Sequence, residues 1–114
     1  MNIKLTKKEV LGNFQNVICV GYCDLWYLLQ YAEKIGHTER AEGWGADIYR
    51  VNNETVIVTG YEPFGNINPN RAITKHYEEK ATRLYRETSR ETIRKKLNKL
   101  LQKYVDEVLE SEAK

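Results

Sequence analysis

The stretch that decides the fold class is Ala46-Asp47-Ile48-Tyr49-Arg50-Val51-Asn52-Asn53-Glu54-Thr55-Val56-Ile57-Val58-Thr59. Apolar and β-branched residues lead into the pair Asn52-Asn53, and a run of β-branched residues follows it. Two such runs on either side of a turn are typical of neighbouring strands. Asparagine tolerates a positive φ better than any other residue except glycine, so the pair suits a tight turn. We therefore predict a β-hairpin over about 45–61.

Two features near the N-terminus predict a short helix and a buried segment. Thr6-Lys7-Lys8-Glu9 has the S/T-x-x-E form of a capping box, and apolar residues follow it with partial helical spacing. The apolar run Val17-Ile18-Cys19-Val20 fits either a short buried strand or an extended segment, because so short a run has no readable period.

A buried helix is predicted between this segment and the hairpin. Its apolar residues recur at steps of three and four: Leu25, Leu28, Leu29 and Ala32. Asp24 is a favourable N-cap, and Gly36 is a favourable residue just past a helix end. These signals predict a helix over about 24–35. A third strand is expected near 37–42.

The C-terminal part of the chain predicts two helices after a structured loop. Segment 60–69 holds two prolines and two glycines, so neither a helix nor a central strand can run through it. Asn70 suits the N-cap of a helix over about 71–87. Thr88-Ser89-Arg90-Glu91 matches the capping box of a second helix over about 89–110. The apolar stripe of this helix extends to Leu109, which a two-helix arm or a homodimer contact would bury.

Together these elements predict an α+β fold with a small antiparallel sheet. We expect the hairpin at about 45–61 to form the sheet. The helix at about 24–35 and the two C-terminal helices are expected to pack on it. The length of 114 residues suits a single domain over 1–114.

The net charge of +2 conceals a strongly basic segment. Residues 71–103 hold 11 lysines and arginines against 4 acidic residues, whereas residues 104–114 hold 1 against 4. At 100° per residue, the lysines of the last helix fall opposite its apolar stripe. The candidates for contact with phosphates or an acidic protein surface are Arg90, Arg94, Lys95, Lys96, Lys99 and Lys103. A solvated helix face without a ligand is the alternative interpretation.

Composition argues against membrane and disulfide-rich proteins. The longest apolar run has five residues, far below the roughly 20 that cross a bilayer. Residues 1–8 lack the apolar core of a secretory signal, so we expect a cytoplasmic protein without membrane association. Two cysteines are too few for a disulfide framework.

No metal, cofactor or catalytic site is expected. The soft ligands of the chain are Cys19, Cys23, His37 and His76, and their spacing does not fit a zinc cluster. A Cys23 nucleophile, or acid–base chemistry by Asp47 and Glu62, are the catalytic alternatives. No nucleotide-binding or hydrolase motif accompanies them, so we expect a non-enzymatic protein.

Aromatic residues and glycines cluster around the predicted hairpin. Tryptophan and tyrosine supply rigid apolar area with a polar tip, a combination enriched at interfaces. The candidates for partner binding are Trp44, Tyr49, Tyr61 and Phe64. An aromatic core beneath the hairpin is the alternative interpretation, and stacking on RNA bases is a third.

This aromatic block, from Gly43-Trp44-Gly45-Ala46-Asp47-Ile48-Tyr49 through Val58-Thr59-Gly60-Tyr61-Glu62-Pro63-Phe64-Gly65-Asn66, resembles short proteins of phages, plasmids and conjugative elements of Gram-positive bacteria. Some small proteins of such elements are type II-A anti-CRISPR proteins, which bind Cas9 or its guide-RNA complex or lower guide levels. The resemblance implies a non-enzymatic inhibitor from a mobile genetic element, with Cas9 or its guide-RNA complex as partner. The alternative is a small nucleic-acid-binding regulatory protein that uses the basic C-terminal helix.

Overall fold

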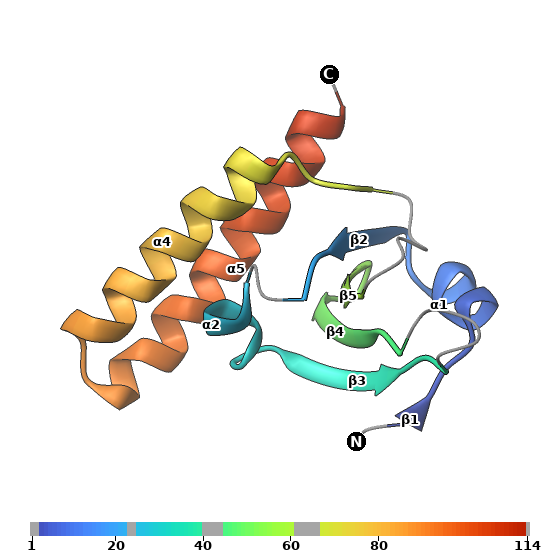
Figure 1. Ribbon diagram of the computed structural model, residues 1–114, viewed down its shortest axis with the longest axis horizontal. Helices are drawn as coiled ribbons and strands as arrows, with labels where there is room; N and C mark the ends of the chain where they lie inside the picture. Colours follow the sequence, from blue (N-terminus) through green and yellow to red (C-terminus); the bar gives the residue numbers. More distant parts are fainter. Residues whose placement is uncertain (1–2, 23–24, 40–44, 61–66, 114) are drawn as a thin grey trace. The chain divides into compact units, whose positions relative to one another are not determined.

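The computed structural model describes residues 3–22, 25–39, 45–60 and 67–113. The chain divides into two compact units: the sheet unit, Met1–Tyr22 with Glu33–Asn68, and the helical unit, Cys23–Ala32 with Pro69–Lys114. Figure 1 shows the strands of the first and the helices of the second. The predicted α+β class is confirmed, because the structure combines a mixed sheet with helices, two of which follow all the strands. The expectation of one domain over 1–114 stays a prediction.

The described part of the sheet unit contains five strands in the order β1-β3-β4-β5-β2. Their bounds are β1 Ile3–Lys4, β2 Asn16–Val20, β3 Glu33–His37, β4 Asp47–Asn52 and β5 Thr55–Thr59. The β3–β4 and β4–β5 pairs are antiparallel, whereas β1–β3 and β2–β5 are parallel. The sheet is therefore mixed, not wholly antiparallel as predicted. Long connections separate the strands of each parallel pair, as parallel pairing requires.

Strands β4 and β5 form the predicted hairpin, but the turn lies at Asn53-Glu54, one residue later than the predicted pair Asn52-Asn53, because Asn52 still pairs with Thr55. The backbone nitrogen of Glu54 donates a hydrogen bond to Asn52 Oδ1 at 2.9 Å, so an asparagine side chain closes the turn. The apolar run at 17–20 belongs to strand β2, which settles the choice between a strand and an extended segment. Val17 pairs with Val56 of β5, and the whole of β5 is buried.

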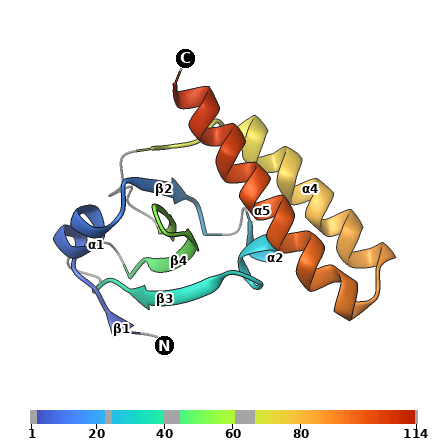
Figure 2. The ribbon, with the colours of Figure 1, turned by 180° about the vertical axis from the view of Figure 1, so that it is seen from behind.

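Helix α1, Lys7–Asn13, packs on the apolar side chains of the sheet (Figure 2). Its predicted capping box is confirmed: the backbone nitrogen of Glu9 donates to Thr6 Oγ1 at 3.1 Å, and that of Thr6 donates to Glu9 Oε1 at 3.3 Å. Val10 of the helix shares one buried cluster with Val17, Cys19, Ala46, Ile48, Val56 and Val58. This cluster is the core of the sheet unit.

The predicted helix over 24–35 is wrong beyond its first turn. Helix α2 spans only Trp26–Leu29, and the chain enters strand β3 at Glu33. Leu25, Leu28 and Leu29 are buried, so one helical turn already satisfies the apolar spacing. The residues from Glu33 onward form β3, which pairs with β4. Across these strands, Glu33 forms an ion pair with Arg50 at 3.3 Å, and Lys34 forms one with Asp47 at 3.1 Å. Strand pairing thus overrides local helix propensity. The predicted N-cap Asp24 lies outside the described residues.

Gly36, predicted to follow a helix end, lies instead inside β3 opposite Ile3 of β1. A Cβ atom at this position would run into the backbone carbonyl oxygen of Ile3. The position therefore requires glycine because two backbones approach closely, not because a helix terminates there. The strand expected near 37–42 is wrong over its described part: β3 ends at His37, residues 38 and 39 belong to no strand, and 40–42 lie outside the described residues.

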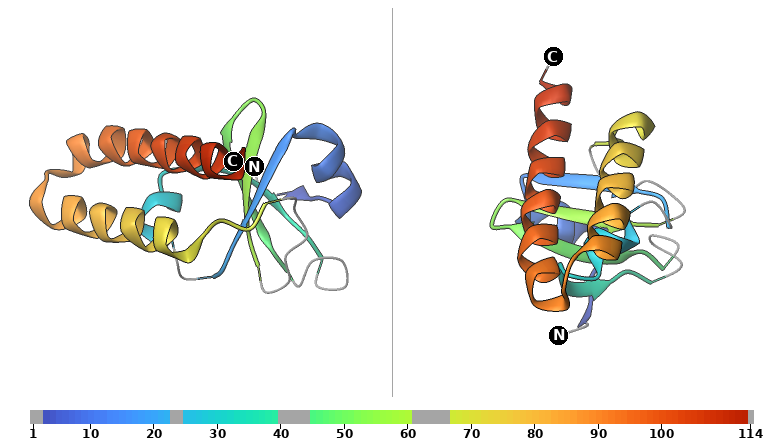
Figure 3. Two further views of the ribbon diagram at one scale, coloured as in Figure 1. Left: turned by 90° about the horizontal axis from the view of Figure 1, so that it is seen from above. Right: turned by 90° about the vertical axis from the view of Figure 1, so that its left-hand side faces the viewer.

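The helical unit consists of α2 and two long helices, α4 at Arg71–Glu87 and α5 at Arg90–Glu112, which run antiparallel (Figure 3). Asn70 Oδ1 accepts from the nitrogen of Ala72 at 2.8 Å, which confirms the predicted N-cap of α4. The capping box predicted for α5 is wrong. Thr88, the predicted N-cap, is instead the C-cap of α4. The N-cap of α5 is Ser89, whose hydroxyl lies 3.1 Å from that of Thr92 and caps no backbone nitrogen. Among the described residues, no helix has the length and apolar character of a bilayer-spanning segment.

Candidate nucleic-acid interface

The solvent side of α5 carries a row of lysines. Lys95, Lys96, Lys99 and Lys103 are all exposed, and we call them the lysine face. The opposite side of the helix is buried through Ile93, Leu97, Leu101, Tyr104, Val105 and Val108. The ion pairs between described residues all lie in the sheet unit, and none involves the lysine face. These four charges are therefore not neutralised by an ion pair with a described carboxylate.

Buried polar and aromatic contacts join α4 and α5 on the side of α5 opposite the lysine face. The hydroxyl groups of Thr74 and Tyr104 lie 2.9 Å apart, and the rings of Tyr77 and Tyr104 meet edge to face with centroids 5.6 Å apart. Burial, a hydrogen bond to the Glu107 carboxylate and the nearby negative charges raise the pKa of Tyr77 to about 12. The Tyr77 hydroxyl thus stays protonated at neutral pH and donates to Glu107.

The last turns of α5 reverse the charge of its surface. The exposed acidic residues there are Asp106, Glu107, Glu110 and Glu112. Gln102 Nε2 donates to Asp106 Oδ1 at 2.9 Å, at the boundary between the basic and acidic parts. The positive potential of α5 is therefore confined to its first part, and the last part would repel a polyanion.

The six basic residues singled out from the sequence do not form one surface. Arg90 and Arg94 are exposed in the first turns of α5 but lie on the same helical stripe as its buried residues. They line an open cleft of about 760 Å³ together with Tyr31, Tyr85, Thr88, Glu91 and Ile93. The lysine face points away from this cleft, so the two sets can bind different parts of a ligand.

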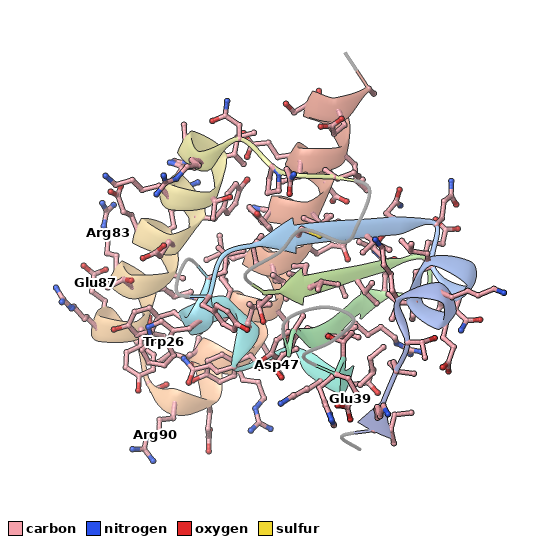
Figure 4. All side chains as sticks on the ribbon, turned by 45° about the vertical axis from the view of Figure 1, so that its right-hand side comes forward. Trp26, Glu39, Asp47, Arg83, Glu87 and Arg90 are labelled. Carbon is pink, nitrogen blue, oxygen red and sulfur yellow. The ribbon has the colours of Figure 1, made fainter. Side chains whose placement is uncertain are left out.

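Exposed aromatic side chains gather beside this cleft. The rings of Trp26 and Tyr27 on α2 are stacked with their centroids 4.0 Å apart. The centroids of the Tyr27 ring and the Tyr85 ring of α4 are 5.4 Å apart. We call these three residues the aromatic cluster. Trp26 is 50% exposed and Tyr85 43% exposed. Figure 4 shows Trp26 in the helical unit with Glu87 and Arg90, near the connection between α4 and α5.

The aromatic block around the hairpin is only partly described. Trp44, Tyr61 and Phe64 lie outside the described residues. Tyr49 is half-buried on β4, paired with Lys34 on one side and Ile57 on the other. Burial, followed by the negative charge of Asp47, raises the pKa of the Tyr49 hydroxyl, and Lys34 opposes this effect. The role of these four residues in partner binding stays a prediction.

The catalytic and metal-binding alternatives fall only partly on described residues. Cys23 and Glu62 lie outside the described residues, and the Asp47 carboxylate forms an ion pair with Lys34 at 3.1 Å. Cys19 is buried in the core of the sheet unit. His76 is exposed on α4, and the described residues contain no group of three or more His, Cys, Asp or Glu suited to a metal ion.

Sequence reasoning missed the aromatic cluster. The candidate residues named from the sequence include neither Trp26 and Tyr27 of α2 nor Tyr85 of α4. The detectable signal was that Trp26 falls off the Leu25, Leu28, Leu29 stripe. A comparison of the chain with protein-family models, curated proteins and solved structures found no match.

Proposed function

We propose that this chain is a non-enzymatic protein that binds nucleic acid through the lysine face of α5. The observation that supports this most directly is the exposure of four lysines on one side of a well-packed helix, without an ion pair to any described carboxylate. Lys95, Lys99 and Lys103 recur every four residues and so form a line about 12 Å long. Lysines in such a line can contact several phosphates of a nucleic-acid backbone. Each contact releases counterions from the nucleic acid, which increases the affinity.

The resemblance of the aromatic block to proteins of mobile genetic elements supports a more specific proposal. The nucleic acid is then the guide RNA of Cas9, bound alone or within its complex, and binding inhibits the nuclease. A guide RNA is a polyanion, so the same lysines serve an inhibitor and a regulatory protein. The inhibitor and the regulatory protein would therefore use the same lysine face and differ in the nucleic acid that they bind.

The binding surface is tested by fluorescence anisotropy with labelled 20-nucleotide RNA and DNA over a range of salt concentrations. The variant Lys95→Gln/Lys96→Gln/Lys99→Gln/Lys103→Gln removes the lysine face. The matched control is Lys4→Gln/Lys7→Gln/Lys8→Gln/Lys34→Gln in the sheet unit. Each set takes the net charge from +2 to −2, so only the position of the lost charges differs. The ion pairs broken in the control are solvent-exposed and contribute little stability.

We expect wild-type affinity for single strands to fall with salt, with a log–log slope of about −0.7 for each phosphate contacted. The lysine-face variant should lose at least tenfold in affinity and about 3 units of slope. The control should bind like wild type. Equal losses in both variants would show that only net charge matters, and no binding by wild type at 50 mM salt would overturn the proposal.

The inhibitor function is tested separately with purified Cas9, guide RNA and a DNA target. We expect excess chain to reduce cleavage and the lysine-face variant to restore it. Capture of Cas9 by the tagged chain should disappear after nuclease treatment if RNA forms the contact. Unchanged cleavage at a large excess of chain would reject the inhibitor function and leave the regulatory protein.

A further inference from the structure

The aromatic cluster is a platform of large side chains exposed to solvent on the helical unit. Stacking of Trp26 on Tyr27 at 4.0 Å and the contact of Tyr27 with Tyr85 at 5.4 Å hold the three rings together. Trp26 and Tyr85 nevertheless leave about half of their surface exposed. Aromatic rings that are held by one another and still face solvent are typical of binding sites rather than of core packing.

The platform is continuous with the arginine-lined cleft. Tyr85 belongs both to the aromatic cluster and to the wall of the cleft, which is about 760 Å³ in volume. Tyr31 supplies a second ring to the same wall. A planar group entering the cleft would therefore find aromatic side chains beside it, in a space larger than one nucleobase needs.

The charge of the cleft selects an anionic ligand. Arg90 and Arg94 lie one helical turn apart on the wall of the cleft, and the only acidic residue among the described lining residues is Glu91. Neither arginine forms an ion pair with a described residue. The planar guanidinium group binds phosphate oxygens in a bidentate manner and also stacks on aromatic rings. A nucleotide in a single strand is recognised by aromatic rings that stack on its base and by guanidinium groups that bind its phosphate. The cleft offers both.

From these contacts we propose that the helical unit binds unstacked bases of single-stranded nucleic acid. One base stacks on Tyr85 in the cleft with its phosphate on Arg90 and Arg94, and a neighbouring base stacks on Trp26 of the adjoining aromatic cluster. This inference rests on the proposed function and adds strand selectivity to it. The lysine face attracts any polyanion, single-stranded or double-stranded. The cleft discriminates, because bases inside a duplex cannot reach an aromatic platform without being unpaired.

The experiment measures affinity for a 20-nucleotide single strand and for the corresponding duplex, as RNA and as DNA, by anisotropy at fixed salt. Trp26→Ala and Tyr85→Ala remove the platform at exposed positions. Tyr85→Phe keeps the ring and is the conservative variant. Tyr22→Ala is the matched control, since Tyr22 is a tyrosine of the sheet unit with 50% exposure. Circular dichroism confirms that each variant is folded.

We expect wild type to prefer single strands over the duplex. Trp26→Ala and Tyr85→Ala should each weaken single-strand binding by about 5- to 100-fold, the range for losing one stacked base. Their duplex affinity and salt slope should not change, because stacking is not ionic. Tyr85→Phe and Tyr22→Ala should bind like wild type. Arg90→Gln/Arg94→Gln should lower the single-strand salt slope by about 0.7 per lost phosphate contact.

The outcomes separate this inference from the proposed function. If the lysine-face variant loses binding while Trp26→Ala and Tyr85→Ala retain it, the function stands and the cleft does not bind bases. Equal losses for single strands and duplex would also overturn base binding. If wild type binds no oligonucleotide but captures nuclease-treated Cas9 in a Tyr85-dependent manner, the cleft takes a protein ligand and both proposals fail.

Discussion

The hydroxyl group of Thr74 on α4 lies 2.9 Å from that of Tyr104 on α5, and both residues are buried. A buried hydroxyl that loses its partner has no water to replace it, so such a pair specifies one alignment of two helices. Tyr104 lies on the side of α5 opposite the lysine face. The pair therefore belongs to the buried side of α5, where five apolar residues pack with Tyr104 and leave the lysine face in solvent.

Removing this hydrogen bond should destabilise the helical unit. Thr74→Val keeps the shape of the side chain but deletes its hydroxyl group, and should lower the free energy of unfolding by about 1 kcal/mol. The measurement is urea denaturation followed by circular dichroism. Thr92→Val, at an exposed position of α5, is the control and should change the free energy by less than about 0.5 kcal/mol. Equal losses would argue against a structural role for the buried pair.

Stability should fall at high pH through Tyr77. Its folded-state pKa is raised to about 12 from the ordinary value of 10.0 by burial and by Glu107 and Asp106. The unfolded chain therefore loses this proton more readily than the folded chain. The stabilisation is complete below pH 10 and is lost as pH rises from about 10 to about 12.

The Tyr77→Phe variant isolates this effect. It should be about 1 kcal/mol less stable than wild type at pH 7, since a hydrogen bond to a carboxylate is lost. The difference should shrink between pH 10 and 12 in denaturation experiments repeated across that range. Tyr85→Phe is the control because Tyr85 is 43% exposed. A constant difference at every pH would mean that Tyr77 does not titrate with a raised pKa.

Two glycine substitutions should have opposite signs. Gly36→Ala places a Cβ atom against the carbonyl oxygen of Ile3, so β1 or β3 must shift. We expect a loss of about 1–3 kcal/mol in the free energy of unfolding, as in overpacked sites. Gly12→Ala in α1 meets no atom within 4 Å and should stabilise by up to about 1 kcal/mol through helix propensity. Thermal denaturation of both variants measures these two changes in stability. A Gly36→Ala protein more stable than wild type would contradict the β1–β3 register.

The two helix N-caps predicted as capping boxes should respond differently to alanine. Thr6→Ala removes the Thr6 hydroxyl, which accepts from the backbone nitrogen of Glu9 and donates to the Glu9 carboxylate, and should cost about 1 kcal/mol. Ser89→Ala should cost less than about 0.5 kcal/mol, because the Ser89 side chain caps no backbone nitrogen of α5. Urea denaturation of the two variants provides the comparison. A larger loss for Ser89→Ala would indicate a cap that is absent from the structure.

Local sequence signals predicted the elements whose stability is itself local. The asparagine turn of the β4–β5 hairpin, the capping box of α1 and the N-cap of α4 depend on residues within four positions of one another. The amphipathic period of α5 likewise predicted which lysines face solvent, because a helix repeats its geometry every few residues. Basic charge and its position on one helix were readable for the same reason.

By itself, the sequence determined the α+β class, the hairpin, the bounds of α4 and α5 to within two residues, and the exposed lysine face. Only the tertiary structure decided that residues 33–37 form a strand, that β1 and β2 pair in parallel, and that Arg90 and Arg94 join Tyr85 at a cleft. Those outcomes depend on pairing and packing between segments far apart in the chain. Their free energies exceed local propensities of less than about 1 kcal/mol per residue, and no short window of sequence contains both partners.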